Sequence, residues 1–581
     1  MTVESEARTG GRQSARFCMV LALMAVGSLT VNLALCVIGF FASKTLSILQ
    51  PLIAIVTVLI ITLLLIRRSR TWTPKLAALL FLSYGLLFTA PIILAGQFHD
   101  VSCDGQTYQG SAVAKLAAGW NPIRDPENID PVRYNWTLNN VLRFPKAHWI
   151  AEAAVVKLTD NLEAGKGLNL VIAVVSFLIT LSLLLELGRS STRVSVVLAL
   201  LVSLNPVTVN QCLSYYNDGQ VSSLLICFIA ASIYLIVKFG SAPLLLLAMI
   251  TLNLSNMKFG ALGLLVILGG IYCVAVLITR PRVQAFRIAA VFAGSLAVGV
   301  LLIGYNPYVI NFKLGGHPFF PFNSFSMSNP MWAAQEVHQT PANFRGRGPI
   351  HALLLSVFSA SSNDFVAEGR TVGPGHLKAP FSVSRSELES FAGVDTKVSG
   401  WGPLFGGITV LTLIALGFLV RRRQPRGPFI SLLIVLGAVT ISVLLLPDHW
   451  NARYAPHLVL IPLAAAIYII LWETGGVRRF AWLIAATMVV NLVLIAGPCF
   501  WAAFTKTRTL NRQLSELVAR KQPVQVCFGE LHFNRARFKS LGIKYQEVPF
   551  SQDVKGEPLA GFLPQAQTTI YSDQGQKGMG D

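Results

Sequence analysis

Long apolar runs, separated by short polar connections, cover most of the chain. Each run has about the length that a helix needs to cross ~30 Å of hydrocarbon, so we expect about thirteen membrane spans. The runs lie at 17–41, 48–66, 75–96, 167–187, 193–213, 220–239, 242–257, 260–279, 286–305, 401–420, 427–447, 453–471 and 479–501. This pattern predicts an all-α polytopic membrane protein.

Three longer polar stretches interrupt this alternation: the loops 97–166 and 306–400 and the tail from about 502. Long ordered loops commonly carry function. In the tail, "QPVQVCFGELHFNRARFKSLGIKYQEVPF" places an Arg-rich helical run between two strand-like runs, which predicts a small βαβ unit. The polar composition of the last ~20 residues predicts disorder there.

The composition agrees with a membrane protein, since 53% of the 581 residues are hydrophobic and 13% are charged. The 47 Lys and Arg residues outnumber the 27 Asp and Glu residues, but much of the excess lies in short connections at the ends of spans. Cytoplasmic loops have this distribution, whereas a nucleic-acid-binding surface does not. The residues concerned are Arg67, Arg68, Arg70, Arg189, Arg193, Arg280, Arg282, Arg287, Arg421, Arg422, Arg423, Arg426, Arg478 and Arg479.

With the N-terminus inside, all these basic connections fall on the cytoplasmic side. The two long loops and the tail are then expected to face the periplasm or exterior. The first apolar run lacks a small-residue cleavage site, so we expect an anchor and no cleaved signal peptide. The eight cysteines form no CxxC pair and predict no metal site, and a disulfide between Cys103 and Cys212 stays an open alternative.

The first outer loop begins with "FHDVSCDGQTYQGSAVAKLAAGWNP" (98–122). After Asp104, apolar residues return at helical spacing, which predicts an amphipathic helix along the outer membrane surface. A carboxylate at the N-terminal end of a helix is often only a cap. The alternative is a general base that accepts a proton from a hydroxyl at the membrane boundary. The apolar positions are Tyr108, Ala112, Val113, Leu116, Ala117 and Trp120.

Three further charged residues are expected at the outer ends of spans. Asp218 lies in "NDG", which also forms turns in proteins of any function. Lys258, in "LSNMKFGALG", is either an interfacial anchor or a cation for a phosphate. Arg453, in "LLLPDHWNARYAPHL", is the strongest phosphate candidate because a guanidinium binds phosphate oxygens in pairs. His449 in the same segment is an auxiliary candidate.

In their order and their shared side, these segments resemble the polyprenyl-phosphate-sugar-dependent glycosyltransferases of the GT-C fold. The acid, tyrosine and turn in the first outer loop of that family match Asp104, Tyr108 and "AGWNP" at 118–122. The family usually has two adjacent acids, whereas here Gly105 follows Asp104, so the second acid would be Asp100. Further matching positions are Pro145, Lys146, Lys166, Asp218, Lys258 and Arg453.

The resemblance covers roughly residues 75–470 and implies a GT-C-like transmembrane bundle with outer loops and amphipathic helices. The residue pattern adds a small C-terminal α/β segment outside it. Together they divide the chain into N-terminal anchor spans (1–74), a catalytic membrane module (75–501) and an extracytoplasmic tail (502–581). The implied reaction transfers a sugar, with inversion, from a polyprenyl-phosphate donor to a hydroxyl of a glycan, glycolipid or cell-envelope polymer. The implied place is the outer face of the cell membrane, and no nucleic acid takes part.

The resemblance also implies roles for single residues. Asp104 is the expected base and Asp100 its second acid, while Arg453 and Lys258 bind the donor phosphate. The implied substrate contacts are Tyr108, Asp218, Lys146 and His449. No cofactor or metal is expected to be required, although a divalent cation could bind among His99, Asp100, Asp104 and Asp218.

Three other classes of protein stay open. A polysaccharide polymerase or ligase with a lipid-pyrophosphate donor would share the hydropathy and the outer arginine, but would not need an acidic first outer loop. A transporter of lipid-linked sugars would place charged groups deep within its spans. It would also be expected to show internal repeats or matched broken helices, which this sequence lacks. In a non-catalytic scaffold, the polar segments would be coincidental.

Overall fold

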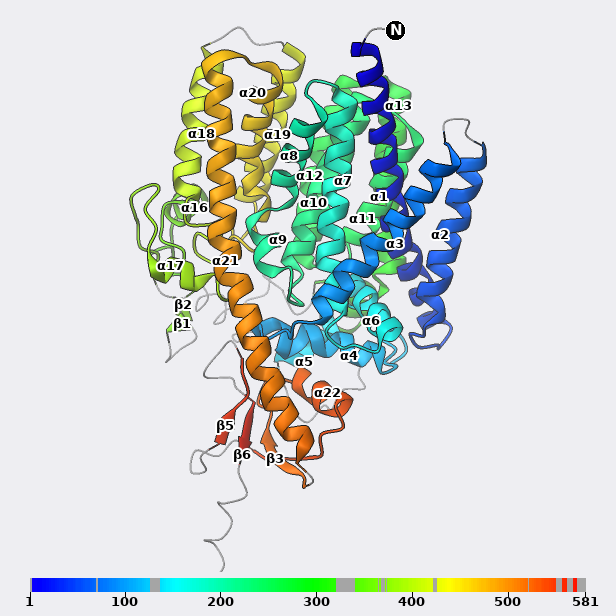
Figure 1. The fold of residues 1–581 in the computed structure, drawn as a ribbon, viewed down its shortest axis with the longest axis vertical. Coiled ribbons are helices and arrows are strands. Elements are labelled where there is room, and N and C mark those ends of the chain that lie inside the picture. The colour runs from blue at the N-terminus through cyan, green and yellow to red at the C-terminus, as the bar shows by residue number, and fades with distance from the viewer. Residues whose placement is uncertain are drawn as a thin grey trace, which may run out of the picture.

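The protein is a helical bundle with a small β-sheet at one end (Figure 1). The structure is a computed structural model of the whole chain. It describes residues 3–68, 72–125, 136–319, 340–363, 365–366, 371–372, 374–421, 426–520, 522–549, 556–561 and 568–571.

The described part contains nine helices that are long and apolar enough to cross a membrane, and four shorter apolar helices. Each predicted span coincides with one of them, so a multi-pass helical membrane protein is confirmed at that level. The helices are α1 (Val3–Phe41), α2 (Leu49–Arg68), α3 (Pro74–Gly96), α7 (Leu168–Leu187), α8 (Thr192–Ser203), α10 (Asp218–Val237), α11 (Ser241–Leu254), α12 (Phe259–Thr279), α13 (Arg282–Val298), α18 (Phe405–Val420), α19 (Arg426–Leu444), α20 (Leu460–Trp472) and α21 (Gly475–Ala519).

The bounds of several predicted spans differ from the structure, for example at α1 and α20, and two of these differences affect the end of the bundle that carries the long loops. The run 193–213 breaks at Leu204 because Pro206, which has no backbone N–H, begins the separate helix α9 (Pro206–Gln211). The last run, predicted at 479–501, continues unbroken to Ala519. No glycine or proline interrupts residues 502–519, and their apolar side chains pack against the sheet of the tail at helical spacing.

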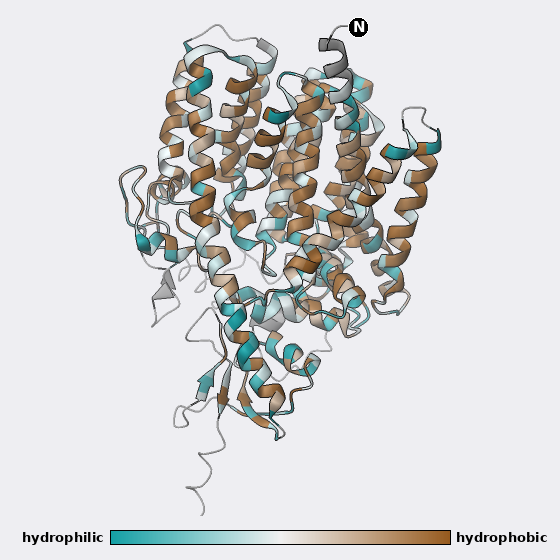
Figure 2. Cartoon of the chain, in the orientation of Figure 1, coloured by the Kyte–Doolittle hydropathy of each residue, from teal (hydrophilic) through white to brown (hydrophobic). Residues whose placement is uncertain are grey.

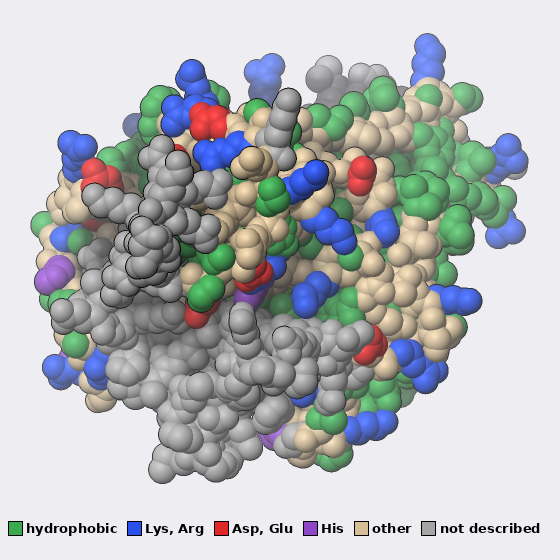
Figure 3. Space-filling view, turned by 90° about the horizontal axis from the view of Figure 1, so that it is seen from below, with side chains coloured by type: hydrophobic (Ala, Val, Ile, Leu, Met, Phe, Trp, Pro, Cys, Tyr) green, Lys and Arg blue, Asp and Glu red, His purple; other side chains and the backbone are tan. Residues whose placement is uncertain are grey.

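Helix α1 lies inside the bundle, although the sequence analysis grouped it with the anchor spans. It packs against α7 and α11, and these two helices also contact α10. The Ser182 hydroxyl donates to the Ala15 carbonyl over 2.8 Å, which joins α7 to α1. By contrast, α2 and α3 expose most of their apolar side chains, as lipid-facing helices do, at the right of Figures 1 and 3.

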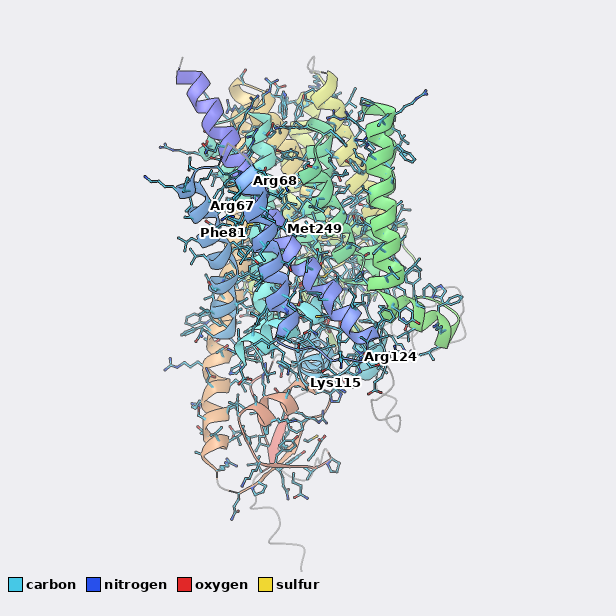
Figure 4. All side chains as sticks on the ribbon, turned by 90° about the vertical axis from the view of Figure 1, so that its right-hand side faces the viewer. Arg67, Arg68, Phe81, Lys115, Arg124 and Met249 are labelled. Atoms are coloured by element: carbon cyan, nitrogen blue, oxygen red, sulfur yellow. The ribbon has the colours of Figure 1, made fainter. Side chains whose placement is uncertain are left out.

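The bundle has two different ends. The N-terminus and the connections α7–α8 and α20–α21 lie at one end, here called the basic end (top of Figure 1). The described parts of both long loops and of the tail lie at the other, the loop end, and apolar helices separate the two (Figure 2). Arg67 and Arg68 lie in the half of the bundle nearer the basic end, whereas Lys115 and Arg124 lie at the loop end (Figure 4). The prediction that both long loops and the tail lie at one end of the bundle is confirmed for their described parts. The side of a membrane that this end faces stays a prediction.

Short elements build the two long loops. The first loop contains η1 (Gly105–Gln109), α4 (Gly110–Ala117), α5 (Trp136–Arg143), α6 (Ala147–Thr159) and η2 (Gly165–Gly167). The second follows η3 (Gly299–Ile303) and contains η4 (Tyr305–Val309), α14 (Ile310–Gly315), α16 (Pro349–Val357), β1 (Phe365–Val366), β2 (Thr371–Val372) and α17 (Arg385–Ser390). The short helix η5 (Pro456–Val459) precedes α20.

The helix predicted after Asp104 forms as η1 and α4, but it does not have the open polar face expected of a surface helix. Residues 105–113 are all buried. Helix α4 packs against α6 on one side, and α22 (Phe533–Ser540) of the tail covers it on the other. The sequence pattern missed this because the covering helix is more than 400 residues away along the chain.

The tail is a four-stranded sheet with strand order β4-β3-β6-β5. Strands β3 (Val524–Cys527) and β4 (Tyr545–Glu547) are parallel and joined through α22, so the predicted βαβ unit is confirmed. Strand β6 (Thr569–Tyr571) pairs antiparallel with both β3 and β5 (Gly556–Pro558). The predicted disorder is therefore wrong at 569–571, and residues 562–567 and 572–581 lie outside the described part.

Cysteine accessibility tests this arrangement. Positions 118 on the first loop and 515 on α21 are exposed at the loop end, and position 192 is exposed at the basic end. A membrane-impermeant maleimide is expected to label Ala118→Cys and Ser515→Cys from one side of the membrane and Thr192→Cys only from the other. The parent chain, with its own eight cysteines, gives the background. Labelling of Ala118→Cys and Ser515→Cys from opposite sides would contradict the fold.

Candidate functional site

The guanidinium of Arg453 lies at the centre of a charged cluster near the loop end of the bundle. Its Nη2 is 2.9 Å from Oδ2 of Asp104 and its Nε is 2.8 Å from Oδ2 of Asp218. Its Nη1 forms a third ion pair with Asp395. Only 9% of the Arg453 side chain is exposed. Four segments that are far apart in the sequence therefore meet at one side chain.

Two lysines complete the cluster. Lys258, directly before α12, places its Nζ 2.5 Å from Oδ1 of Asp218 and keeps 24% of its side chain exposed. Lys397 lies 3.8 Å from Asp395. We call these six residues the Arg453 cluster: Asp104, Asp218, Lys258, Asp395, Lys397 and Arg453.

Local structure fixes Asp218 at the first turn of α10. Gln211 of α9 donates from Nε2 to Oδ2 of Asp218 over 3.1 Å and accepts from the Gly219 backbone N–H over 2.9 Å. A Cβ at Gly219 would come within 3.2 Å of the Thr208 Cα, so a larger residue would require the neighbouring backbone to shift by a few tenths of an ångström. The "NDG" sequence therefore forms a turn and also positions the Asp218 carboxylate in the cluster.

Aromatic rings cover the cations. The Arg453 guanidinium lies 4.5 Å from the ring centre of Tyr216, and Nζ of Lys258 lies 4.3 Å from that of Tyr454. Such contacts favour a desolvated cation. Tyr108 also reaches the cluster, since its hydroxyl lies 3.5 Å from Oδ2 of Asp104. The backbone N–H of Asp104 donates to the Tyr216 hydroxyl over 3.3 Å.

The cluster is neutral as a whole, but its surroundings shift the pKa values of single residues. Its three carboxylates face three cations, so its formal charges cancel. Burial raises the pKa of Asp104, and the neighbouring Asp395 and Asp218 add to this rise against the opposing charge of Arg453. Burial alone would lower the pKa of Arg453, but the three carboxylates raise it well above its ordinary value. The site therefore increases the basicity of Asp104. Burial also raises the pKa of two other acids in the same loop, Asp100 and Glu152.

Asp100 is held separately from the cluster. Its Oδ1 accepts from the backbone N–H and the hydroxyl of Ser102, over 2.8 and 2.5 Å, and its Oδ2 accepts from the Tyr215 N–H over 2.6 Å. A Cβ at position 105 would lie 2.0 Å from this Oδ2. A side chain at position 105 would therefore collide with the buried Asp100 carboxylate.

Two other predicted substrate contacts also lie outside the Arg453 cluster. Lys146 donates to the carbonyls of Leu142 and Phe144, each over 2.8 Å, and to Oδ1 of Asn306 over 2.7 Å. It therefore joins the first long loop to the beginning of the second. His449 is buried and shares a hydrogen bond of 3.0 Å with the Leu446 carbonyl through Nδ1.

Four residues of the site were not predicted from the sequence: Asp395, Lys397, Tyr216 and Tyr454. Asp395 and Lys397 lie at the end of the long second loop, a few residues before α18. The other charged members of the cluster also lie near the ends of spans, but no sequence pattern singles out Asp395 or Lys397 within the long loop. Charged residues from both long loops thus meet at the loop end, which Figure 3 views directly.

Neither a metal site nor a disulfide is formed among these residues. In the described part of the chain, no group of three or more His, Cys, Asp or Glu side chains is arranged to hold a metal ion. His99 instead contacts Glu163 and Asn511 through its two ring nitrogens. Cys103 and Cys212 are both free thiols, which excludes the alternative of a disulfide between them in this structure.

No protein-family model matches the chain, and no curated protein matches it either. The functional assignment therefore depends on the residues of the site and their geometry.

The arrangement predicts that Arg453 is needed for folding as well as for any chemistry. Replacing it with Gln would leave three buried carboxylates without their shared cation, which is expected to cost about 3–5 kcal/mol of unfolding free energy at neutral pH. Thermal unfolding in detergent measures this loss. Adding Asp395→Asn to Arg453→Gln is expected to restore part of it, because one uncompensated charge is removed. Equal stability of Arg453→Gln and the parent would contradict the cluster.

Proposed function

We propose that the protein is a membrane glycosyltransferase that uses a polyprenyl-phosphate sugar as donor and a hydroxyl as acceptor. The observation that carries this proposal is the meeting of Asp104, Arg453 and Lys258 at the ends of membrane helices. A base for the acceptor and cations for the departing phosphate are the two requirements of the reaction. The resemblance of the sequence to GT-C enzymes supports the same reaction.

The proposed step is a direct displacement at the anomeric carbon. The acceptor oxygen forms a bond to this carbon as its proton passes to Asp104. The bond between the carbon and the phosphate oxygen breaks, and its electron pair leaves with the polyprenyl phosphate. Arg453 and Lys258 stabilise the charge that grows on this phosphate. Attack opposite the leaving group inverts the anomeric configuration.

In the structure Arg453 is shared among three carboxylates, so a donor phosphate has to compete with them. Nη2 is the nitrogen paired with Asp104, the most exposed of the three acids at 18%. We propose that the phosphate takes over this nitrogen. The Asp104 carboxylate would then lose a hydrogen bond that lowers its basicity just when the acceptor needs a base.

The place of the cluster suits a lipid-linked donor. Asp218 begins α10 and Lys258 immediately precedes α12, both apolar enough to cross a membrane. A phosphate at this level can be bound while its polyprenyl chain stays in hydrocarbon. We propose that the loop end faces the outside of the cell membrane, as the basic connections predict. A glycan, glycolipid or envelope polymer would then be the acceptor.

The protein's own residues supply the charges for this mechanism. The proposal assigns the phosphate to Arg453 and Lys258 and requires no cofactor or metal. A transporter is less well supported, because charged residues in the described spans stand near their ends and not at mid-depth. A polymerase or ligase with a pyrophosphate donor could use the same cations, but it would not explain the acidic first loop.

Asp104→Asn tests the base. Asn keeps the size of the side chain and removes its basicity, so transfer to a glycan or lipid acceptor is expected to slow by at least ~10²-fold in purified protein. Expression and melting temperature should stay near those of the parent. Asp160→Asn makes the same change on an exposed residue of the same loop and should leave transfer unchanged.

Asp100→Asn gives a second comparison. It removes one acceptor from a buried hydrogen-bond network and is expected to lower stability more than it lowers turnover. Near-parental transfer by Asp104→Asn would contradict its role as base, and loss of transfer in Asp100→Asn alone would reassign that role to Asp100.

The pH dependence of transfer tests the coupling within the cluster. Because the base must be ionised, kcat/KM is expected to fall as pH falls through the Asp104 pKa, which burial raises above its ordinary value of 3.8. Asp395 raises this pKa further, so Asp395→Asn should move the acid limb to lower pH. Glu389→Gln, an exposed acid in the same long loop, is the control and should move nothing. A limb that stays in place in Asp395→Asn would contradict the coupling.

A further inference from the structure

The C-terminal tail is docked on the segment that carries Asp104. We propose that it is part of the active site, and that Arg537 of α22 is a positioning residue for the Asp104 carboxylate. The role given to Asp104 rests on the proposed function, whereas the docking itself does not.

Arg537 reaches out of the tail into the first long loop. Its Nε and Nη2 lie 2.8 and 2.6 Å from Oε1 of Glu163, and only 3% of its side chain is exposed. Its Nη2 also donates to the Asp100 backbone carbonyl over 2.5 Å. Its Nη1 donates to Oδ1 of Asn534 over 2.7 Å, which fixes the plane of the guanidinium. All three nitrogens are thus engaged.

Glu163 transmits this contact to the same backbone. Its Oε2 accepts from the Asp100 N–H over 2.9 Å and from Nζ of Lys166 over 2.6 Å. The Asp100 peptide groups are therefore held on the N–H side by Glu163 and on the carbonyl side by Arg537. Burial alone would raise the pKa of Glu163, but Arg537 and Lys166 lower it well below its usual range. The carboxylate is consequently charged at neutral pH.

The tail also holds the chain on the other side of Asp104. Asn534 donates to Oε1 of Gln106 over 3.2 Å and to the Thr568 hydroxyl over 2.8 Å. The ring of Phe533 packs so closely on Gly110 that a Cβ there would come within 2.8 Å of it. Asp104 thus lies between two points, at Asp100 and Gln106, that α22 contacts directly.

The extension of α21 adds a third attachment. Thr507 accepts a hydrogen bond from the His99 backbone N–H over 3.0 Å, and Asn511 contacts Nε2 of the His99 ring over 2.8 Å. Both contacts come from the part of α21 that continues from the bundle into the tail (Figure 1). The helix fixes the tail relative to the bundle, and the tail then fixes the loop.

This arrangement matters for catalysis because a base works only at the right distance. Displacement of a catalytic group by about 1 Å can cost ~10²-fold in rate. A loop segment needs such support, since side chains in catalytic sites are held by the residues packed behind them. The buried forked contact of Arg537 provides that support, and a lysine could not reproduce its paired geometry.

The test compares Arg537→Gln and Arg537→Lys with Arg535→Gln in the full-length purified protein. Arg535 lies on the same helix but pairs with Glu547 inside the tail, so it is a matched control. Two readouts are needed: hydrogen–deuterium exchange of residues 99–117, and steady-state transfer from a polyprenyl-phosphate sugar.

We expect Arg537→Gln to speed exchange in 99–117 by at least about tenfold and to lower kcat by about 10²-fold with little change in KM, because the donor-binding cations are untouched. Arg537→Lys should fold like the parent and show a smaller change in the same two quantities. Arg535→Gln should change neither.

The outcomes separate the two proposals. Parental exchange and parental kcat in both Arg537 variants would overturn the positioning role, as would faster exchange with an unchanged kcat. Loss of kcat in Arg535→Gln equal to that in Arg537→Gln would also overturn it, because a general weakening of the tail would then suffice. If the parent transfers no sugar from any polyprenyl-phosphate donor, the proposed function fails. The exchange measurement then still decides whether Arg537 holds the loop.

Discussion

A buried guanidinium shared by three carboxylates is the interaction on which the loop end of this protein depends. A carboxylate removed from water is costly unless a cation and hydrogen bonds compensate it. Asp104, Asp218 and Asp395 come from three separate segments, and each is compensated by Arg453 from a fourth. The first long loop, the α9–α10 turn, the end of the second long loop and the segment before α20 are therefore assembled by the same contacts that build the site.

A second buried ion pair adds a constraint from outside the bundle. Arg537 and Glu163 join the tail to the first loop, and the segment 99–109 takes part in both networks. Asp104 lies between them, on a short helix that is buried under α22. The tail therefore covers and orients a segment of the first long loop that the bundle helices alone do not cover.

Hydropathy and charge were sufficient to predict the spans. They also predicted that the basic connections lie at one end of the bundle and the long loops and tail at the other. Asp218, Lys258 and Arg453 could also be selected from the sequence, because each stands immediately beside an apolar run. Asp395 could not, since it lies in a long irregular loop where no periodicity indicates which residues turn inward. Asp100 and Asp104 look equivalent in sequence, and only the Ser102 and Tyr215 contacts separate a structural acid from a candidate base. The docking of Arg537 joins positions 374 residues apart, which no local pattern could indicate.

We propose that the Arg453 cluster binds a lipid-linked phosphate, and native mass spectrometry of the purified protein measures this binding. The protein is expected to retain polyprenyl phosphate and to release polyprenol of the same chain length, because only the phosphate meets the two cations. Lys258→Gln should weaken retention of the phosphate by at least about tenfold. Lys238→Gln, which changes an exposed lysine paired with Glu186 at the basic end, should not. Equal retention of polyprenol and polyprenyl phosphate, or parental binding by Lys258→Gln, would contradict the account.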